Sequence, residues 1–151
     1  MDVFAKLSET YKEYEIRIES IDGIDYFIIS NPFWDEDIWV SNEDGIIFWF
    51  WSLHKHFDYC ESMDENIDCL IACINDFLDG KWVSAEFFRG DTALGGSSRR
   101  LDDIDMSSRE SLIKSFAGSV SAFYEALCNE ASRCLIRGWD NAHNKDIDFL
   151  L

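Results

Sequence analysis

The sequence predicts an α+β fold, in which an antiparallel meander sheet of about five to six strands packs against one amphipathic helix and a long C-terminal helix. Two observations predict it. Short apolar runs with period-two alternation are separated by turn signals, and two longer segments with helical spacing each follow a capping sequence. With 151 residues, 47% of them hydrophobic, and one proline, the chain is expected to form a single domain over residues 1–151.

The first elements are a short helix, expected within residues 2–12, and a four-stranded antiparallel meander. Ile21-Asp22-Gly23 is a turn signal between the first two strands, and Asn31-Pro32 interrupts the chain before the third. Asn42 to Gly45 forms a tight turn before the last strand, which is strongly apolar. The four strands are expected at residues 14–19, 25–29, 38–40 and 46–51.

An amphipathic helix is expected from about Met63 to Asp79. Ser62 and Glu65 form a capping-box pattern, in which each side chain can satisfy the backbone N–H of the other residue, and Gly80 is a natural C-terminal stop. Apolar residues gather on one face of this helix, and carboxylates form a stripe on the opposite face. The stripe consists of Asp64, Glu65, Asp68, Asp76 and Asp79.

The second half is expected to contain a fifth strand at residues 82–88 and a glycine-serine loop over residues 90–98, with a sixth strand allowed around residues 98–101. The arginines beside this loop are expected to be solvated. Ser107 and Glu110 repeat the capping-box pattern ahead of the long helix, which is expected to bend near Gly118 and to end at Gly138. The apolar residues at 147–151 are expected to dock on the core.

Acidic residues dominate the stretch between Arg17 and Lys81, where fifteen carboxylates accompany a single base, Lys55. Such acidic stretches are usually poor in apolar residues and disordered. This one is rich in Ile, Phe and Trp, so it is expected to fold and to hold its charge on a rigid surface. Because the whole chain has 30 acidic against 13 basic residues, nucleic-acid binding is disfavoured and a basic protein partner is favoured.

The sequence also bears on the cellular compartment. Its start lacks the basic residues and apolar core of a secretory signal, and no stretch approaches the roughly 18 apolar residues of a membrane span. Five cysteines, an odd number, favour free thiols in a reducing compartment. We therefore expect a cytoplasmic protein with no membrane partner. Cys69 and Cys73 lack the second pair of a zinc site and are expected to pack as small hydrophobes.

One segment suggests metal chemistry. If the chain is extended there, His54, His56 and Asp58 point to the same side, as a site of two histidines and one carboxylate requires. The alternative is that the histidines pack against aromatic residues. No serine or cysteine has the surroundings of a catalytic nucleophile, and no phosphate-binding loop is present. We therefore expect no enzyme activity, no cofactor and no metal, with a metal-dependent enzyme as the alternative.

Two surfaces are expected to bind the partner: the segment Asn31 to Asp37, which is acidic and aromatic, and the carboxylate stripe. In the segment, Trp34 is the expected anchor, since buried aromatic residues beside charges dominate many interfaces. The equally open alternative is that Phe33 and Trp34 plug the end of the sheet. The expected partner-binding residues are Phe33, Trp34, Asp35, Glu36, Asp37, Asp64, Glu65, Asp68, Asp76 and Asp79.

This order of elements resembles the small acidic immunity proteins that bacteria encode beside polymorphic or contact-dependent toxins. Three segments carry the resemblance: the aromatic strand and His-x-His-Phe-Asp of Trp49 to Asp58, the capped acidic helix of Ser62 to Gly80, and Gly80-Lys81-Trp82. The resemblance implies inhibition of a cognate toxin, often a nuclease with a basic cleft, by occlusion and without catalytic residues. A self-associating structural or regulatory domain is a further alternative.

Overall fold

The computed structural model describes residues 2–149. These residues form four α-helices and nine strands in two antiparallel sheets, which confirms the α+β class. Internal contacts divide the chain into two compact units, Met1–Asp76 and Phe77–Leu151, and each unit is described by itself. The expectation of a single domain over residues 1–151 stays a prediction.

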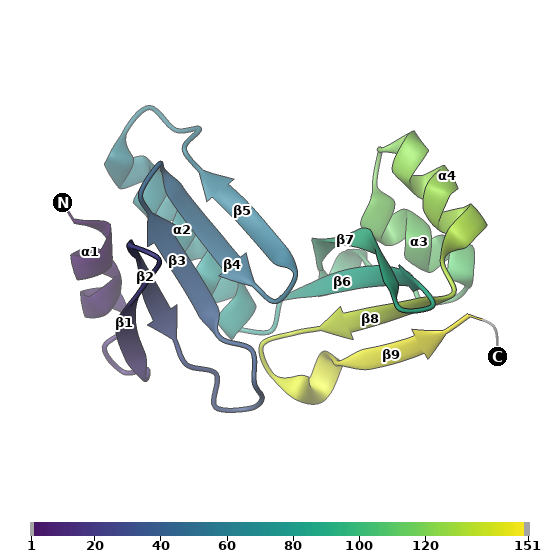
Figure 1. The fold of residues 1–151 in the computed structure, drawn as a ribbon, viewed down its shortest axis with the longest axis horizontal. Helices are drawn as coiled ribbons and strands as arrows, with labels where there is room; N and C mark the ends of the chain where they lie inside the picture. Colours follow the sequence, from purple (N-terminus) through teal and green to yellow (C-terminus); the bar gives the residue numbers. More distant parts are fainter. Residues whose placement is uncertain (1, 150–151) are drawn as a thin grey trace. The chain divides into compact units, whose positions relative to one another are not determined.

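The first unit contains a five-stranded meander with the strand order β1-β2-β3-β4-β5 (Figure 1). The four strands predicted by the sequence are confirmed to within two residues at each end, and β5 adds a fifth at the edge of the sheet. The elements are α1 (Val3–Thr10), β1 (Ile16–Ile21), β2 (Ile24–Ile29), β3 (Ile38–Asn42), β4 (Ile46–Phe50), β5 (Leu53–Phe57) and α2 (Met63–Leu78), whose last two residues lie past the boundary between the units.

Two hairpin turns of this sheet place residues other than glycine in the left-handed region. Asp22 (φ 54°) and Gly23 (φ 82°) join β1 to β2 at the predicted turn. Positive φ at both positions matches the right-handed twist of the strands, which favours an Asp-Gly pair. Trp51 (φ 52°) lies between β4 and β5. A bulky residue in this conformation costs about 1–3 kcal/mol, so the surrounding structure must hold it in place.

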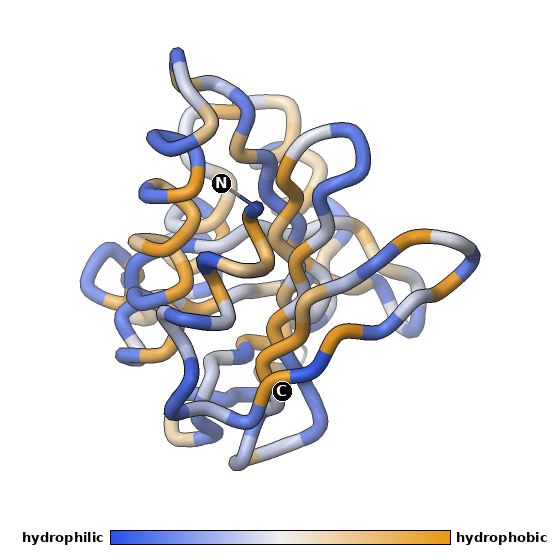
Figure 2. The backbone as a smooth tube through the Cα atoms, turned by 90° about the vertical axis from the view of Figure 1, so that its left-hand side faces the viewer, coloured by the Kyte–Doolittle hydropathy of each residue, from blue (hydrophilic) through white to orange (hydrophobic). Residues whose placement is uncertain are grey.

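One face of the sheet packs against α1 and α2 to form the core of the first unit. The Tyr11 hydroxyl ties the end of α1 to α2 by donating hydrogen bonds to the Asn75 amide oxygen at 2.9 Å and the Ile71 carbonyl at 3.2 Å. Burying each large apolar side chain contributes about 1.5–3 kcal/mol. Figure 2 shows hydrophobic and hydrophilic residues interspersed along the chain, with hydrophilic residues at most loop tips. The buried residues of this core include Phe27, Val40, Phe48 and Phe50 of the sheet, Val3 and Leu7 of α1, and Ile67, Leu70 and Ile74 of α2.

The opposite face of the sheet, which we call the aromatic face, is turned away from α1 and α2. Because side chains alternate between the two faces of a strand, residues paired across the sheet line up in rows on one face. The first row on the aromatic face is Arg17, Ile28, Trp39, Trp49 and His54. The second row is Glu19, Tyr26, Ser41, Ile47 and His56. Two of the tryptophans therefore lie outside the helix-covered core.

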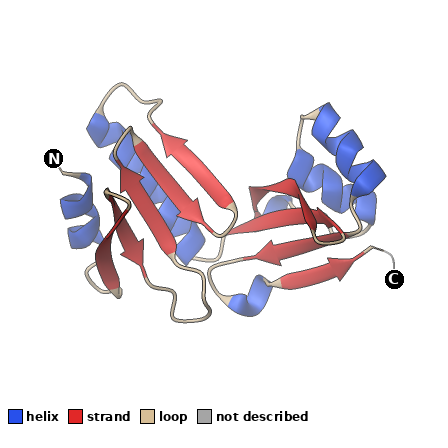
Figure 3. Cartoon of the chain, viewed as in Figure 1, coloured by secondary structure: helices blue, strands red, loops and turns tan. Residues whose placement is uncertain are grey.

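The second unit is a four-stranded antiparallel sheet with the strand order β7-β6-β8-β9, and it also contains α3 and α4 (Figure 3). Ser108 caps α3 by accepting a hydrogen bond from the Ser111 backbone N–H at 3.0 Å, so the helix begins one residue later than the Ser107 pattern predicts. The elements are β6 (Trp82–Arg89), β7 (Thr92–Arg100), α3 (Arg109–Ala117), α4 (Ser121–Glu130), β8 (Arg133–Arg137) and β9 (Lys145–Asp148), with short 3-10 turns at Leu101–Asp103 and Asn141–His143.

The prediction of one long C-terminal helix is wrong. Gly118, with φ 60° and ψ −131°, ends α3, and α4 ends at Glu130. The segment that follows is β8, which pairs with β6. Cys134 and Ile136 are buried and alternate with half-buried neighbours, which is the period of a strand. Pairing with β6 satisfies the backbone of this segment and buries both side chains, so it prevails over the helical spacing.

The prediction of a loop over residues 90–98 is also wrong, because β7 runs from Thr92 and pairs with β6 along its length. A Cβ on Gly96 would lie 1.9 Å from the carbonyl oxygen of Ala85, and one on Gly95 would lie 3.4 Å from the Phe123 ring of α4. Glycine in a strand often marks such close approaches. The expected single sheet is therefore two sheets within residues 2–149.

The end of the chain confirms its predicted docking in part. β9 pairs with β8, and the Phe149 ring lies 6.5 Å from the Phe87 ring in a stacked arrangement. Phe87 is fully buried in the core of the second unit. Residues 147–149 therefore contact that core, while Leu150 and Leu151 lie outside the described residues.

Two arginines cap the C-terminal ends of α3 and α4, where backbone carbonyls have no partner within the helix. Arg99, expected to be solvated, instead donates from Nε to the Ser115 carbonyl at 3.1 Å and from Nη2 to the Phe116 carbonyl at 3.0 Å. Arg109 caps α4 in the same way, and its guanidinium lies 5.3 Å from the Phe149 ring centroid. Its Nη2 donates to the carbonyls of Leu127 at 3.2 Å, Cys128 at 2.8 Å and Ala131 at 2.9 Å.

We expect Arg109→Ala to lower the free energy of unfolding by about 2 kcal/mol, because three carbonyls lose a charged donor at a helix end. Chemical denaturation measures this change. The control is Arg89→Ala, which removes an exposed arginine 3.9 Å from Glu130 and should change stability by less than about 0.5 kcal/mol. Equal effects of the two substitutions would contradict the capping role.

Candidate functional site

The candidate binding surface lies mainly in the first unit, where negative charge is concentrated. Residues 1–76 contain 18 acidic and 4 basic residues, a net charge of −14, whereas residues 77–151 contain 12 and 9, a net charge of −3. The four bases are Lys6, Lys12, Arg17 and Lys55. The location and contacts of Arg17 decide much of what this surface can bind.

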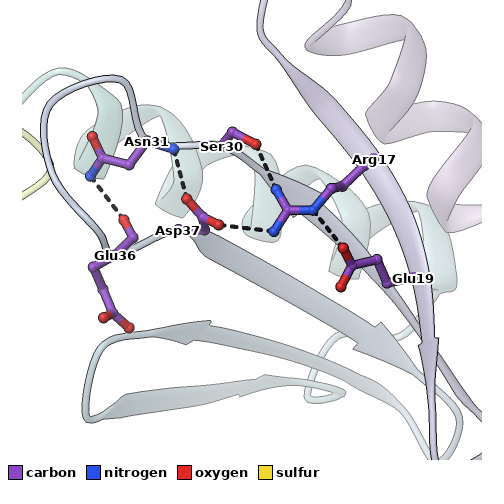
Figure 4. Close-up of polar contacts among 6 residues, drawn as sticks. All are labelled: Arg17, Glu19, Ser30, Asn31, Glu36 and Asp37. Atoms are coloured by element: carbon purple, nitrogen blue, oxygen red, sulfur yellow. Dashed lines mark hydrogen bonds and ion pairs between the residues drawn. The ribbon is translucent and has the colours of Figure 1, made fainter.

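Residues 30–37, which join β2 to β3, have a conformation held by their own polar groups (Figure 4). The Asn31 backbone N–H donates to Asp37 Oδ1 at 2.8 Å, and the Asn31 side-chain amide donates to the Glu36 carbonyl at 2.8 Å. The Asn31 amide oxygen accepts from the Phe33 backbone N–H at 2.9 Å. These hydrogen bonds order residues 30–37, which we call the platform, although the segment has no regular secondary structure.

Arg17 of β1 anchors this platform to the sheet. Its guanidinium donates to Glu19 Oε1 at 2.8 Å, to Ser30 Oγ at 2.6 Å and to Asp37 Oδ2 at 3.1 Å (Figure 4). Its Cζ also lies 6.0 Å from the centroid of the Trp39 ring on the aromatic face. Of the predicted partner-binding residues, Asp37 is therefore a structural carboxylate, shared between a backbone N–H and Arg17.

The two aromatic residues of the platform differ in their surroundings. Phe33 is 53% exposed. Trp34 is half-buried, and its ring meets the ring of the fully buried Phe50 edge-on at a centroid distance of 6.2 Å. Trp34 thus contacts the core, as the interpretation of a plug at the sheet end has it, and Phe33 is the aromatic side chain of the platform with the larger exposed surface.

Glu36 lines a groove on the aromatic face. The groove has a volume of about 300 Å³ and is lined by Ile21, Tyr26, Glu36, Trp39, Trp49 and Trp51. Burial raises the pKa of the Glu36 carboxyl above its ordinary value, as do the charges of Asp37 and Asp35, while a hydrogen bond from the Trp51 backbone opposes the shift. Figure 4 shows the Glu36 carboxylate pointing away from Arg17 and Asp37.

Of the five carboxylates of the predicted stripe, Asp64, Glu65 and Asp68 of α2 are exposed. Ser62 Oγ accepts from the Glu65 backbone N–H at 3.2 Å, as the capping sequence predicts, while the Glu65 carboxylate accepts from the backbone N–H of Glu61 at 3.2 Å. Acidic side chains in the first turn also interact favourably with the helix dipole. Part of this charge therefore stabilises the helix.

The remaining residues of the stripe have other surroundings. Asp76 is half-buried, and Asp79 belongs to the second unit, where it pairs with Lys81 at 3.8 Å. Lys6 of α1 shares a shallow groove of about 240 Å³ with Asp64 and Asp68. The predicted residues therefore do not form a single patch: α2 covers the core face of the sheet, and Glu36 lines the aromatic face.

The histidines of β5 pack against aromatic rings. The His54 ring centroid lies 5.2 Å from that of Trp49 and 5.4 Å from that of His56. Within residues 2–149, no group of three His, Cys, Asp or Glu side chains is arranged to hold a metal ion, so His54, His56 and Asp58 do not form such a group. The geometry is that of the packing alternative.

One contact between thiols was not expected from the sequence. Cys69 lies beside Cys60, with 3.7 Å between the sulfur atoms, as well as one turn before Cys73. Burial raises the pKa of the Cys73 thiol to about 11 and that of the Cys134 thiol to about 12. Both thiols are therefore protonated at neutral pH and poorly nucleophilic, and for Cys73 this agrees with its expected role as a packing residue.

The groove on the aromatic face is the feature that sequence reasoning missed. Trp39 and Trp49 each lie between buried residues of their strands, so alternation alone indicates that they point away from the core. Their meeting depends on the register of β3 with β4, which pairs Trp39 with Trp49. Both the burial of their neighbours and the register come from the structure, because the sequence from Ile46 to Trp51 is uniformly apolar.

In the part of the chain that the structure describes, no helix is both long and apolar enough to cross a membrane. Comparisons with protein families, with curated proteins and with solved structures found no match to this chain.

We expect Arg17→Gln to speed hydrogen exchange of the Asn31 backbone N–H about tenfold. This N–H donates to Asp37, and the substitution removes the cation that holds Asp37 and Ser30 in place. Exchange followed by NMR or mass spectrometry measures this. Lys12→Gln is a matched control, since it also removes one positive charge but breaks only an exposed pair with Glu9. If the two substitutions alter exchange at Asn31 equally, Arg17 is not the anchor.

Proposed function

We propose that this chain is a non-catalytic acidic binding protein, and specifically an immunity protein that neutralises a cognate bacterial toxin in the cytoplasm by occluding the toxin's basic surface. The single observation that carries this proposal is the charge distribution of the first unit, with a net charge of −14 on residues 1–76. A basic catalytic cleft, as in a nuclease, is the surface that such a charge complements.

The contacts of the bases support this proposal. Arg17 is engaged by two carboxylates and a hydroxyl, and Lys12 pairs with Glu9 at the surface. These pairs neutralise only a few of the 18 acidic residues in residues 1–76. The field outside the first unit is therefore strongly negative, which speeds encounter with a basic partner and repels nucleic acid.

The exposed Phe33 supplies the second requirement of a tight complex, a side chain that can be buried at the centre of the interface. It lies on the platform that Arg17 and Asn31 hold in place, so little conformational freedom is lost when a partner covers it. The acidic residues around it, Asp35 among them, then contribute mainly to the rate of association and to specificity.

The partner is identified by capture from the cells that make this protein, with the whole chain as bait. The captured protein is then produced alone and together with this chain. The proposal expects a basic protein that harms the cell when made alone and is harmless when made with this chain. A harmless partner, or toxicity that this chain leaves unchanged, would contradict it.

With the isolated partner, we expect the association rate constant to fall at least tenfold between low and high salt, because the attraction acts over distances that salt screens. Stopped-flow mixing measures this rate. Replacing Asp64 and Asp68 with Asn should slow association severalfold, whereas the matched replacement of Asp102 and Asp103, exposed acids of the second unit, should change it less. A rate that does not depend on salt would argue against the acidic surface.

A further inference from the structure

We propose that the groove lined by Tyr26, Glu36, Trp39, Trp49 and Trp51 is a subsite for one arginine side chain of the partner protein. The inference deepens the proposed function and rests on it, since it names the chemical group that the acidic protein takes from a basic partner. It assigns a role to the aromatic face, which lies on the other side of the sheet from the carboxylate stripe of α2.

The lining of the groove is chemically suited to a cation. Apart from Ile21 and Glu36, the residues that line the groove are one tyrosine and three tryptophans, whose ring faces carry negative electrostatic potential. A cation over such rings is attracted by about 0.5–2 kcal/mol, most strongly over tryptophan. Arg17 of the same sheet already uses this attraction, with its Cζ 6.0 Å from the Trp39 centroid.

Contacts within the sheet hold three of these rings in place before any partner arrives. The Tyr26 and Trp39 rings meet edge-on at 5.5 Å, and the Trp49 ring lies 5.2 Å from His54. The Trp49 indole N–H points to Ser41 Oγ, 3.5 Å away. Side chains that are already ordered lose little entropy on binding, so the groove is suited to recognition.

The groove also contains a carboxylate that can accept from a cation. Glu36 lies in the groove, turned away from the guanidinium of Arg17, which is held by Glu19, Ser30 and Asp37 (Figure 4). Its raised pKa shows that burial there disfavours the charged form. An incoming cation would offset that cost, whereas an anion or a purely apolar group would not.

Arginine fits these features better than lysine. A guanidinium is planar, stacks on aromatic rings and can donate two parallel hydrogen bonds to a carboxylate, whereas an ammonium is compact and strongly hydrated. A groove of about 300 Å³ accommodates one such side chain. The groove therefore combines the stacking surface and the acceptor that a guanidinium uses together.

The test uses N-acetyl-arginine amide as the probe and the whole chain as the protein. Binding is followed by tryptophan fluorescence and by NMR shifts of the indole N–H groups of Trp39 and Trp49. We expect saturable binding with a dissociation constant on the order of millimolar. N-acetyl-citrulline amide, which has nearly the same shape but no charge, and N-acetyl-lysine amide should each bind at least about fivefold more weakly.

Two substitutions that remove the same single charge separate the groove from the general acidity of the platform. Glu36→Gln should weaken binding of the arginine probe about tenfold, because it removes the carboxylate of the groove. Asp35→Asn, at an exposed neighbour that does not line the groove, should change it less than twofold. Circular dichroism of both variants checks that each is folded, and Trp49→Phe provides a second variant if Glu36→Gln unfolds.

Several results would overturn the subsite. These are equal binding of the citrulline or lysine amide, equal effects of the two substitutions, no saturable binding of the arginine amide, or indole shifts that depend on protein concentration alone and so indicate a second copy of this chain. The probe experiment needs no partner, so its failure is distinct from failure of the proposed function. If association with a toxin depends on salt and Glu36→Gln leaves it unchanged, the proposed function stands and only the subsite is removed.

Discussion

In a chain with 30 acidic and 13 basic residues, three arginines lie where oxygen atoms of the fold require a donor. Arg17 holds the platform between β2 and β3, while Arg99 and Arg109 cap the ends of α3 and α4. A guanidinium can donate several hydrogen bonds at once, so one cation satisfies a group of acceptors. Because Arg99 and Arg109 donate mainly to backbone carbonyls, they leave much of the negative charge on the surface.

The three successive carboxylates of the platform have three different surroundings. Asp35 is exposed, Glu36 lines the aromatic groove, and Asp37 is bound to Arg17 and to the backbone of Asn31. The sequence presents them as one acidic run, yet their surroundings suit them to steering, to a specific contact and to structural support. Only the first two have a role in the proposed recognition of a basic partner.

Local signals predicted much of the first unit. Alternation, the Asp22-Gly23 turn and the Ser62 cap indicated its strands and its second helix, because each signal depends on residues within one turn or strand. The errors lie where contacts are long-range. Cys134 fits the apolar spacing of a helix as well as that of a strand, and only pairing with β6 decides between them. Gly96 is typical of a loop, but in the structure it allows β7 to approach the Ala85 carbonyl of β6 closely.

The candidate site divides in the same way. The sequence by itself determined the excess of carboxylates and the capped acidic helix, since composition and capping signals are properties of the chain. Tertiary structure alone decided that Trp39 and Trp49 point away from the core and pair, that Glu36 lines the same groove and that Asp37 binds Arg17. The physical reason is that strand register is set by backbone hydrogen bonds and by packing between distant segments, which have no local signature in the sequence.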